Sequence, residues 1–336
     1  MRIRTSLCVL YCIGFLTLAS CQPSKTKNVS VADPEMKVQA DLFLQNMAAD
    51  LQHRQAVAIR QAIDGNNIPL NAVRNARNTP PQLSDNVQAR MLTPSLRLYE
   101  PKAEKKKTTP VLLYFHGGGW TFGSLNSCGR FCNAMAASGQ MKVIALDYRL
   151  APEHPFPAGL DDCAEAVRYV REHAEALGID PKQICLGGDS SGGNLAIACA
   201  MHPSCEGVIH SLLLFYPVTK AYNDQSHSWN AYGKGYGLDA EIMEEFNRAY
   251  VGDDDVRNTR ISVGLCTNEE LQRLPRTLLI AAGRDILRDQ GCEFAERLGR
   301  KATRVEYADA VHLFITVPGQ DKAFDEAVKA SVEFIQ

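Results

Sequence analysis

Residues 188–192 read Gly-Asp-Ser-Ser-Gly, and they stand between an apolar run, Ile184–Leu186, and a helical pattern, Gly192–Met201. This Gly-x-Ser-x-Gly pattern is therefore predicted at a turn from a strand into a helix, where a serine hydroxyl is exposed and a strained backbone needs small neighbours. The start of the helix offers free N–H groups and positive potential to a developing oxyanion. Ser190 is thus a candidate nucleophile, and Ser191 is a rival that lacks the flanking glycine spacing.

Apolar runs and helical patterns alternate along most of the chain. Continuous apolar runs, typical of strands buried on both faces, are Val111–Phe115, Val143–Leu146, Ile184–Leu186, Leu212–Tyr216 and Thr277–Ala281. Further strands are predicted at Met91–Tyr99 and Thr303–Tyr307. Helices are predicted within Pro34–Ile63 and at Leu160–Leu177, Gly192–Met201, Gln290–Leu298 and Asp321–Ile335. The alternation predicts an α/β fold with a mostly parallel, doubly wound sheet.

One polar, glycine-rich stretch, Ala221–Cys266, interrupts the alternation between two predicted strands. An insertion at that point is expected over the carboxyl ends of the strands, where open α/β sheets bind ligands. Together with the N-terminal helices it predicts a helical cap, built from about residues 33–75 and 221–266 of a domain that spans residues 33–336.

A second glycine motif, His116-Gly-Gly-Gly-Trp120, follows the predicted strand that ends at Phe115. Consecutive glycines allow the N–H groups of Gly117, Gly118 and Gly119 to point at one site, as an oxyanion hole requires. The alternative is a flexible loop with no such role. Trp120 and the tyrosines of the insertion are candidates to line a modest apolar substrate pocket.

A nucleophilic serine needs a base and an acid that orients it, and the order Ser, Asp, His along the chain suggests where they lie. His312 follows a predicted strand and precedes the last helix, so it is the candidate base. Asp285 is the acid closest to the end of the strand Thr277–Ala281. Asp289 is the runner-up and ranks below Asp285, because it falls inside the next helix.

Five motifs in order resemble the hormone-sensitive-lipase-like branch of the α/β-hydrolases, which includes bacterial acetyl esterases and arylacetamide deacetylases. They are HGGGW at 116–120, DYRLAPEHPFPA at 147–158, GDSSGGNLA at 188–196, DILRD at 285–289 and HLF at 312–314. The resemblance covers about residues 96–336. It implies an α/β-hydrolase fold, a catalytic triad of Ser190, Asp285 and His312, and oxyanion donors at Gly118, Gly119 and the N–H of Ser191.

The chain departs from the usual pattern of that branch at three positions. The branch usually has Asp-Pro-Leu where this chain has Asp285-Ile286-Leu287, and His-Gly-Phe where it has His312-Leu313-Phe314. Ser191 is more often alanine. The leucine at 313 is expected to affect the backbone of the histidine loop.

The expected function is that of a serine carboxylesterase that hydrolyses small, short-acyl (acetyl) esters through an acyl-enzyme, with no metal or organic cofactor. An amidase or peptidase on the same fold is an alternative. A non-catalytic ligand-binding relative of such enzymes is another.

The composition does not favour binding of nucleic acid, because the formal net charge is −2 and the sequence indicates no basic face. The first 20 residues resemble a bacterial lipoprotein signal peptide, with Arg2 and Arg4, the short apolar run Leu7–Leu18, and a lipobox that ends at Cys21. This predicts acylation of Cys21, a tether over residues 21–32, and an exported protein anchored to a membrane by lipid. The alternative is an ordinary cleaved signal peptide.

Overall fold

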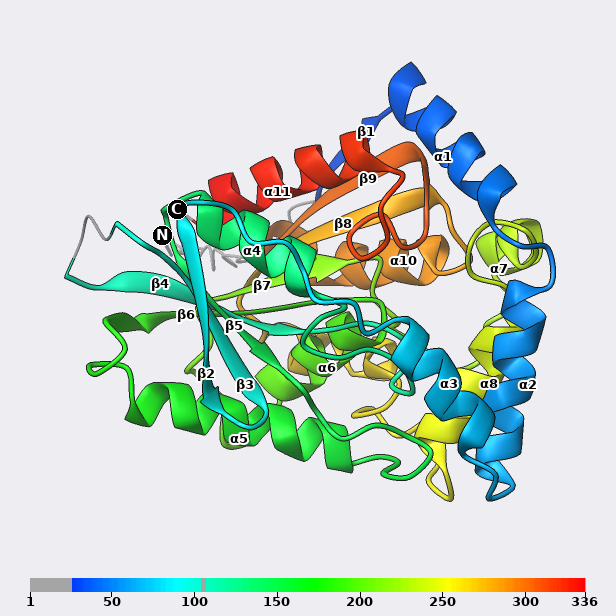
Figure 1. Ribbon diagram of the computed structural model, residues 1–336, viewed down its shortest axis with the longest axis horizontal. Helices are drawn as coiled ribbons and strands as arrows, with labels where there is room; N and C mark the ends of the chain where they lie inside the picture. The colour runs from blue at the N-terminus through cyan, green and yellow to red at the C-terminus, as the bar shows by residue number, and fades with distance from the viewer. Residues whose placement is uncertain (1–25, 104–106, 336) are drawn as a thin grey trace, which may run out of the picture.

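The computed structural model describes residues 26–103 and 107–335 (Figure 1). The strands are β1 (Lys27–Val31), β2 (Val87–Thr93), β3 (Leu96–Pro101), β4 (Thr109–Phe115), β5 (Lys142–Leu146), β6 (Ile179–Asp189), β7 (Ser211–Phe215), β8 (Arg276–Arg284) and β9 (Ala302–Val311). The helices are α1 (Pro34–Asn46), α2 (Leu51–Ile63), α3 (Ile68–Ala76), α4 (Gly129–Ala137), α5 (Ala158–Glu172), α6 (Ser191–Ala200), α7 (His227–Tyr232), α8 (Ala240–Val251), α9 (Asn268–Leu271), α10 (Arg288–Leu298) and α11 (Asp321–Ile335).

The strands of the described residues form one sheet in the order β1-β9-β8-β7-β6-β4-β5-β3-β2. In this order, every neighbouring pair from β1 through β9, β8, β7, β6 and β4 to β5 is parallel. Strand β3 pairs antiparallel with both β5 and β2. The predicted α/β class with a mostly parallel sheet is therefore confirmed. Parallel strands place their carboxyl ends at the same edge of the sheet, so the loops after β4, β6, β8 and β9 converge there.

Helices cover both faces of the sheet, as the continuous apolar runs predict. Neighbouring residues of β4 show this, because Leu113 packs in one apolar core and Leu112 packs in the other. The first core holds buried residues of α5, α6 and α10, and the second holds buried residues of α4 and α11. The sheet is thus a rigid support for the loops at its edge.

Two predictions differ from the structure. Met91–Tyr99 is not one strand, because residues 94–95 turn the chain and β2 pairs antiparallel with β3. The expected tether over residues 21–32 is wrong for Lys27–Val31, which form edge strand β1 and pair in parallel with β9. Cys21 and the predicted signal peptide lie outside the described residues.

Helices α2, α3, α7 and α8 gather at one side of the sheet in Figure 1. Helix α2 packs against α8, and Arg60 forms an ion pair with Glu245 at 2.7 Å across this contact. Helix α1 instead packs on β9 and α11. Among the described residues, no helix combines the length and apolar character needed to cross a membrane.

Candidate active site

Ser190 occupies the turn between β6 and α6, as the sequence predicts. Its φ of 53° and ψ of −118° lie outside the usual regions for a residue with a side chain. The turn is held by a bond from the Ser190 N–H to the Phe215 carbonyl at 2.9 Å, and by one from the Val218 N–H to the Ser190 carbonyl at 3.1 Å. A Cβ on Gly192 would lie 2.0 Å from the carbonyl oxygen of Phe115, so only glycine allows helix α6 to start this close to β4.

His312 and Asp285 meet in the loops that follow two adjacent strands. Nδ1 of His312 lies 2.6 Å from Oδ2 of Asp285, and both side chains are buried. The other carboxylate oxygen of Asp285 accepts the N–H of Leu287 at 2.9 Å. Gln320 steadies the histidine from the other side, because its Nε2 donates to the His312 carbonyl at 3.1 Å. The contact with Asp285 holds the ring by Nδ1 and leaves Nε2 for another partner.

Ser190 and His312 both line a cavity of about 50 Å³ at the carboxyl edge of the sheet. No hydrogen bond joins the Ser190 hydroxyl to the imidazole in the described structure, and such bonds in ligand-free enzymes are often loose until substrate binds. Gln55 of α2 and Phe246 of α8 also line this cavity. In the part of the chain that is described, no three His, Cys, Asp or Glu side chains are grouped to hold a metal ion.

The glycine loop after β4 presents two backbone donors to this cavity. Gly118 and Gly119 have φ values of 121° and 60°, and within the described residues their N–H groups donate to no acceptor. A Cβ on Gly119 would lie 2.1 Å from Cγ of Phe246, which excludes any larger residue there. Ser191 is the first residue of α6, where an N–H has no partner within the helix.

Gly117 does not fit its predicted role as an oxyanion donor. Its N–H donates to Oδ1 of Asp189 at 3.0 Å and is therefore already occupied. The same oxygen accepts the Tyr114 hydroxyl at 2.8 Å. Burial raises the pKa of Asp189, and these two hydrogen bonds act in the opposite direction.

Asp189 lies within the Gly-x-Ser-x-Gly motif, but the motif predicts no role for its side chain. A charged residue at the end of an apolar strand was the available signal, since such a residue needs buried partners. The structure shows that Asp189 ties the glycine loop to the serine turn.

Trp120 does not line the cavity, so its prediction as a pocket residue is wrong. Its φ of 58° sends the side chain into the core, where the ring stacks on Tyr250 with centroids 4.2 Å apart. Phe122 and Phe246 line the cavity instead, in an edge-to-face pair at 5.2 Å. Helix α8 and the glycine loop therefore meet through aromatic rings on both sides of the loop.

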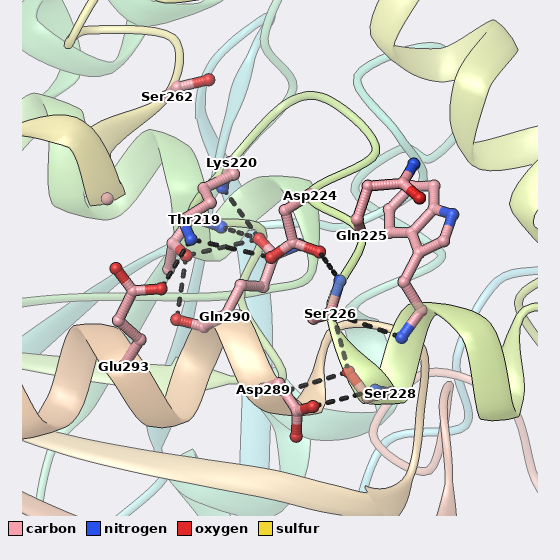
Figure 2. Close-up of polar contacts among 12 residues, drawn as sticks. Thr219, Lys220, Asp224, Gln225, Ser226, Ser228, Ser262, Asp289, Gln290 and Glu293 are labelled. Atoms are coloured by element: carbon pink, nitrogen blue, oxygen red, sulfur yellow. Dashed lines mark hydrogen bonds and ion pairs between the residues drawn. The ribbon is translucent and has the colours of Figure 1, made fainter.

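A polar network joins the insertion after β7 to α10, directly after the Asp285 loop (Figure 2). Oε1 of Gln290 accepts the N–H groups of Thr219 and Lys220 at 2.6 and 2.8 Å. Ser228 donates its N–H to Asp289 at 2.8 Å and its hydroxyl to the Ile286 carbonyl at 2.9 Å. The runner-up acid Asp289 thus holds α7 in place, and Asp285 contacts the histidine.

A second cavity of about 830 Å³ adjoins the small one. Residues of α1, α2, α3 and of the loop 313–318 line it. The two cavities share the lining residues Gln52, Gln55, Arg77, Ser127, Leu313 and Thr316. The larger cavity therefore continues from the side of the small one where Leu313 stands.

Leu313 has a φ of 75°, in the left-handed region that favours glycine. We expect Leu313→Gly to be more stable than Leu313→Ala by about 0.5–1 kcal/mol, because relief of about 1–2 kcal/mol of backbone strain exceeds the entropy that glycine costs. Urea unfolding of both variants measures the difference. At buried Leu287, where φ is −89°, the alanine variant should be the more stable of the pair. The same order at both positions would contradict the strain at 313.

The chain resembles known proteins in sequence and in fold. A family model described as alpha/beta hydrolase fold matches residues 112–316. Esterase LipI of Mycobacterium tuberculosis is 35% identical over 237 residues, which are 69% of this chain and 74% of that protein. An ethyl acetate hydrolase of Pseudomonas putida is 34% identical over 252 residues, 72% of this chain and 77% of that protein.

A solved structure of the ester hydrolase EH1AB1, from the metagenome of Lake Arreo, matches with a TM-score of 0.70 and 31% identity. The match covers 91% of this chain and 97% of that one, and that protein was complexed with a derivative of bipyridine phosphonate. The chain belongs to the α/β-hydrolase family, in its hormone-sensitive-lipase-like branch, and is a carboxylic ester hydrolase.

Proposed function

We propose that the chain hydrolyses small carboxylic esters through an acyl-enzyme formed on Ser190. The hydrogen bond of 2.6 Å between His312 and Asp285, beside the serine turn in a shared cavity, carries this proposal. His312 takes the proton of the Ser190 hydroxyl as its oxygen attacks the ester carbonyl, and Asp285 keeps the imidazole in the tautomer that can accept it. The attack converts the carbonyl oxygen into an oxyanion.

The N–H groups of Gly118, Gly119 and Ser191 bind that oxyanion. They are positioned before the reaction starts, so no reorganisation is needed when charge develops. His312 then gives its proton to the departing alcohol, and water, activated by the same imidazole, cleaves the acyl-enzyme and restores Ser190. Helices α2, α3, α7 and α8 act as the cap that shields these steps from bulk water.

The acyl group is short, preferably acetyl. The cavity beside Ser190 measures only about 50 Å³ and is closed on one side by Phe246. The adjoining cavity of about 830 Å³ has room for the alcohol portion. The relationship to a protein named ethyl acetate hydrolase also supports an acetyl substrate.

Replacing Ser190 by alanine should lower kcat/KM for 4-nitrophenyl acetate by about four orders of magnitude or more, because attack on the carbonyl loses its nucleophile. A fluorophosphonate probe, which reacts only with an activated serine, should label the wild type and not Ser190→Ala. Ser191→Ala keeps its backbone N–H and should still be labelled. Labelling that is lost with Ser191→Ala and kept with Ser190→Ala would make the rival serine the nucleophile. Circular dichroism checks that each variant is folded.

The value of kcat/KM should fall as the acyl chain of the ester lengthens, so that 4-nitrophenyl acetate and butyrate are hydrolysed well above the rate for octanoate. A longer chain meets Phe246, so Phe246→Ala should raise the rate for octanoate relative to acetate by about ten-fold, which corresponds to burying one or two more methylene groups. Initial rates at subsaturating ester measure both ratios. A wild type that prefers octanoate would rule out the short-acyl assignment.

We also propose that the protein is exported and held at a membrane by lipid on Cys21. The support is the basic, apolar and small-residue pattern that ends at this cysteine, which resembles a lipobox. Strand β1 begins at Lys27, so only a few residues would separate the lipid from the sheet. The esterase site would then act close to the membrane surface.

Expressed in a bacterium fed labelled palmitate, the wild type should carry label and sediment with membranes, and Cys21→Ser should do neither. The variant should still hydrolyse 4-nitrophenyl acetate, since the site lies in the folded domain. Cys292→Ser, which replaces a cysteine of α10, is the matched control and should remain labelled. An unlabelled wild type in the soluble fraction would instead indicate an ordinary cleaved signal peptide.

A further inference from the structure

Arg77 stands where the two cavities join. It is the residue directly after α3, it is partly buried, and it lines both the small cavity at Ser190 and the larger one beside it. Its guanidinium carbon lies 5.4 Å from the centre of the Phe122 ring. A cation at this point is within the reach of a substrate whose carbonyl sits at the serine.

Arg77 forms no ion pair among the described residues, in contrast to Arg74, which lies three residues earlier, within α3. Arg74 forms an ion pair with Glu153 at 2.7 Å and donates to the carbonyls of Thr121 and Ala151. No hydrogen bond or ion pair of the Arg77 side chain is formed in the described structure. Burial lowers the pKa of Arg77, and the negative charge of Asp189 acts in the opposite direction.

The other charged groups around the cavities are already paired. Arg54 and Arg130 line the larger cavity, and they form ion pairs with Asp50 at 3.2 Å and Asp321 at 2.6 Å. Asp189 lines the small cavity and attracts Arg77 through its charge, but it forms no ion pair with Arg77, and its Oδ1 accepts bonds from Tyr114 and Gly117. Among the residues that line both cavities, Arg77 is therefore the charged one, and its guanidinium forms no hydrogen bond or ion pair in the described structure.

We propose that Arg77 binds a carboxylate of the substrate, so that the enzyme prefers small esters that carry a second, ionised carboxyl group. This inference rests on the proposed esterase function of the same site. A guanidinium suits the task because its planar N–H groups match the two oxygens of a carboxylate. The pairing takes place in a partly closed cavity, where a charged hydrogen bond is stronger than in open water.

Two pairs of substrates test the preference, each with a carboxylate ester and a neutral amide of the same shape. Monoethyl succinate and ethyl succinamate place the group on the acyl side and both release ethanol. O-acetylglycolate and O-acetylglycolamide place it on the alcohol side and both release acetate. The wild type should hydrolyse the anionic member of at least one pair with a kcat/KM about ten-fold or more higher, the size expected for one charged hydrogen bond.

Three variants locate the effect. Arg77→Met keeps a long side chain at this position and removes the charge, so the preference should disappear while the neutral esters change by less than about three-fold. Arg77→Lys keeps the charge without the planar fork and should retain part of the preference. Arg168→Met removes an equal charge from the exposed face of α5 and should leave both substrate pairs unchanged.

The outcomes separate this inference from the esterase function itself. A wild type without anionic preference in either pair would overturn the role of Arg77, and so would a preference that survives in Arg77→Met. Equal loss of anionic and neutral ester hydrolysis in Arg77→Met would also overturn it, because the residue would then be structural. Failure of the esterase function would show differently, as a wild type that cleaves no ester or a Ser190→Ala variant that remains active.

Discussion

The buried hydrogen bond between His312 and Asp285 is the interaction on which the rest of the site depends. It joins two loops that follow adjacent parallel strands, β9 and β8, and both groups are buried. A buried carboxylate and imidazole are costly to place in the interior unless each satisfies the other. The bonds from Leu287 to Asp285 and from Gln320 to the His312 carbonyl support this pair, because they hold the two loops at the distance that the hydrogen bond requires.

Asp189 does for the serine side what Asp285 does for the histidine side. Its carboxylate joins the strand that leads to Ser190 to the glycine loop with the proposed oxyanion donors, through Gly117 and Tyr114. The bonds of Gln290 and Asp289 then attach the insertion after β7 to α10. Each group with a proposed role thus lies on a loop that begins at a strand of the sheet and is tied by hydrogen bonds to another part of the chain, which is how a rigid scaffold positions a site.

The two cavities differ in what they select. The small one is shaped by the close approach of Gly119 to Phe246, so we propose that it limits the group that sits against the serine. The large one is bounded by helices of the N-terminal part and by the loop after His312. Leu313 and Arg77 stand at their junction, one with a strained backbone and the other with an unpaired charge. We therefore propose that specificity in this chain depends on the few residues between the cavities rather than on the proposed triad.

The sequence by itself determined the parallel α/β sheet and the places of Ser190, Asp285 and His312, because these follow from local patterns: apolar runs of strand length, glycines around a strained turn, and loop positions after strands. It also indicated that Asp289 belongs to the next helix. It did not determine that β2 and β3 form a hairpin, that Lys27–Val31 join the sheet, or that α3 exists, since short or exposed segments depend on their neighbours. The direction of the Trp120 ring, the occupation of the Gly117 N–H and the isolation of Arg77 were decided only by tertiary structure. The physical reason is the same in each case. The contacts of a side chain or N–H group depend on residues from distant parts of the chain that fold against it, and a local sequence pattern does not show which residues these are.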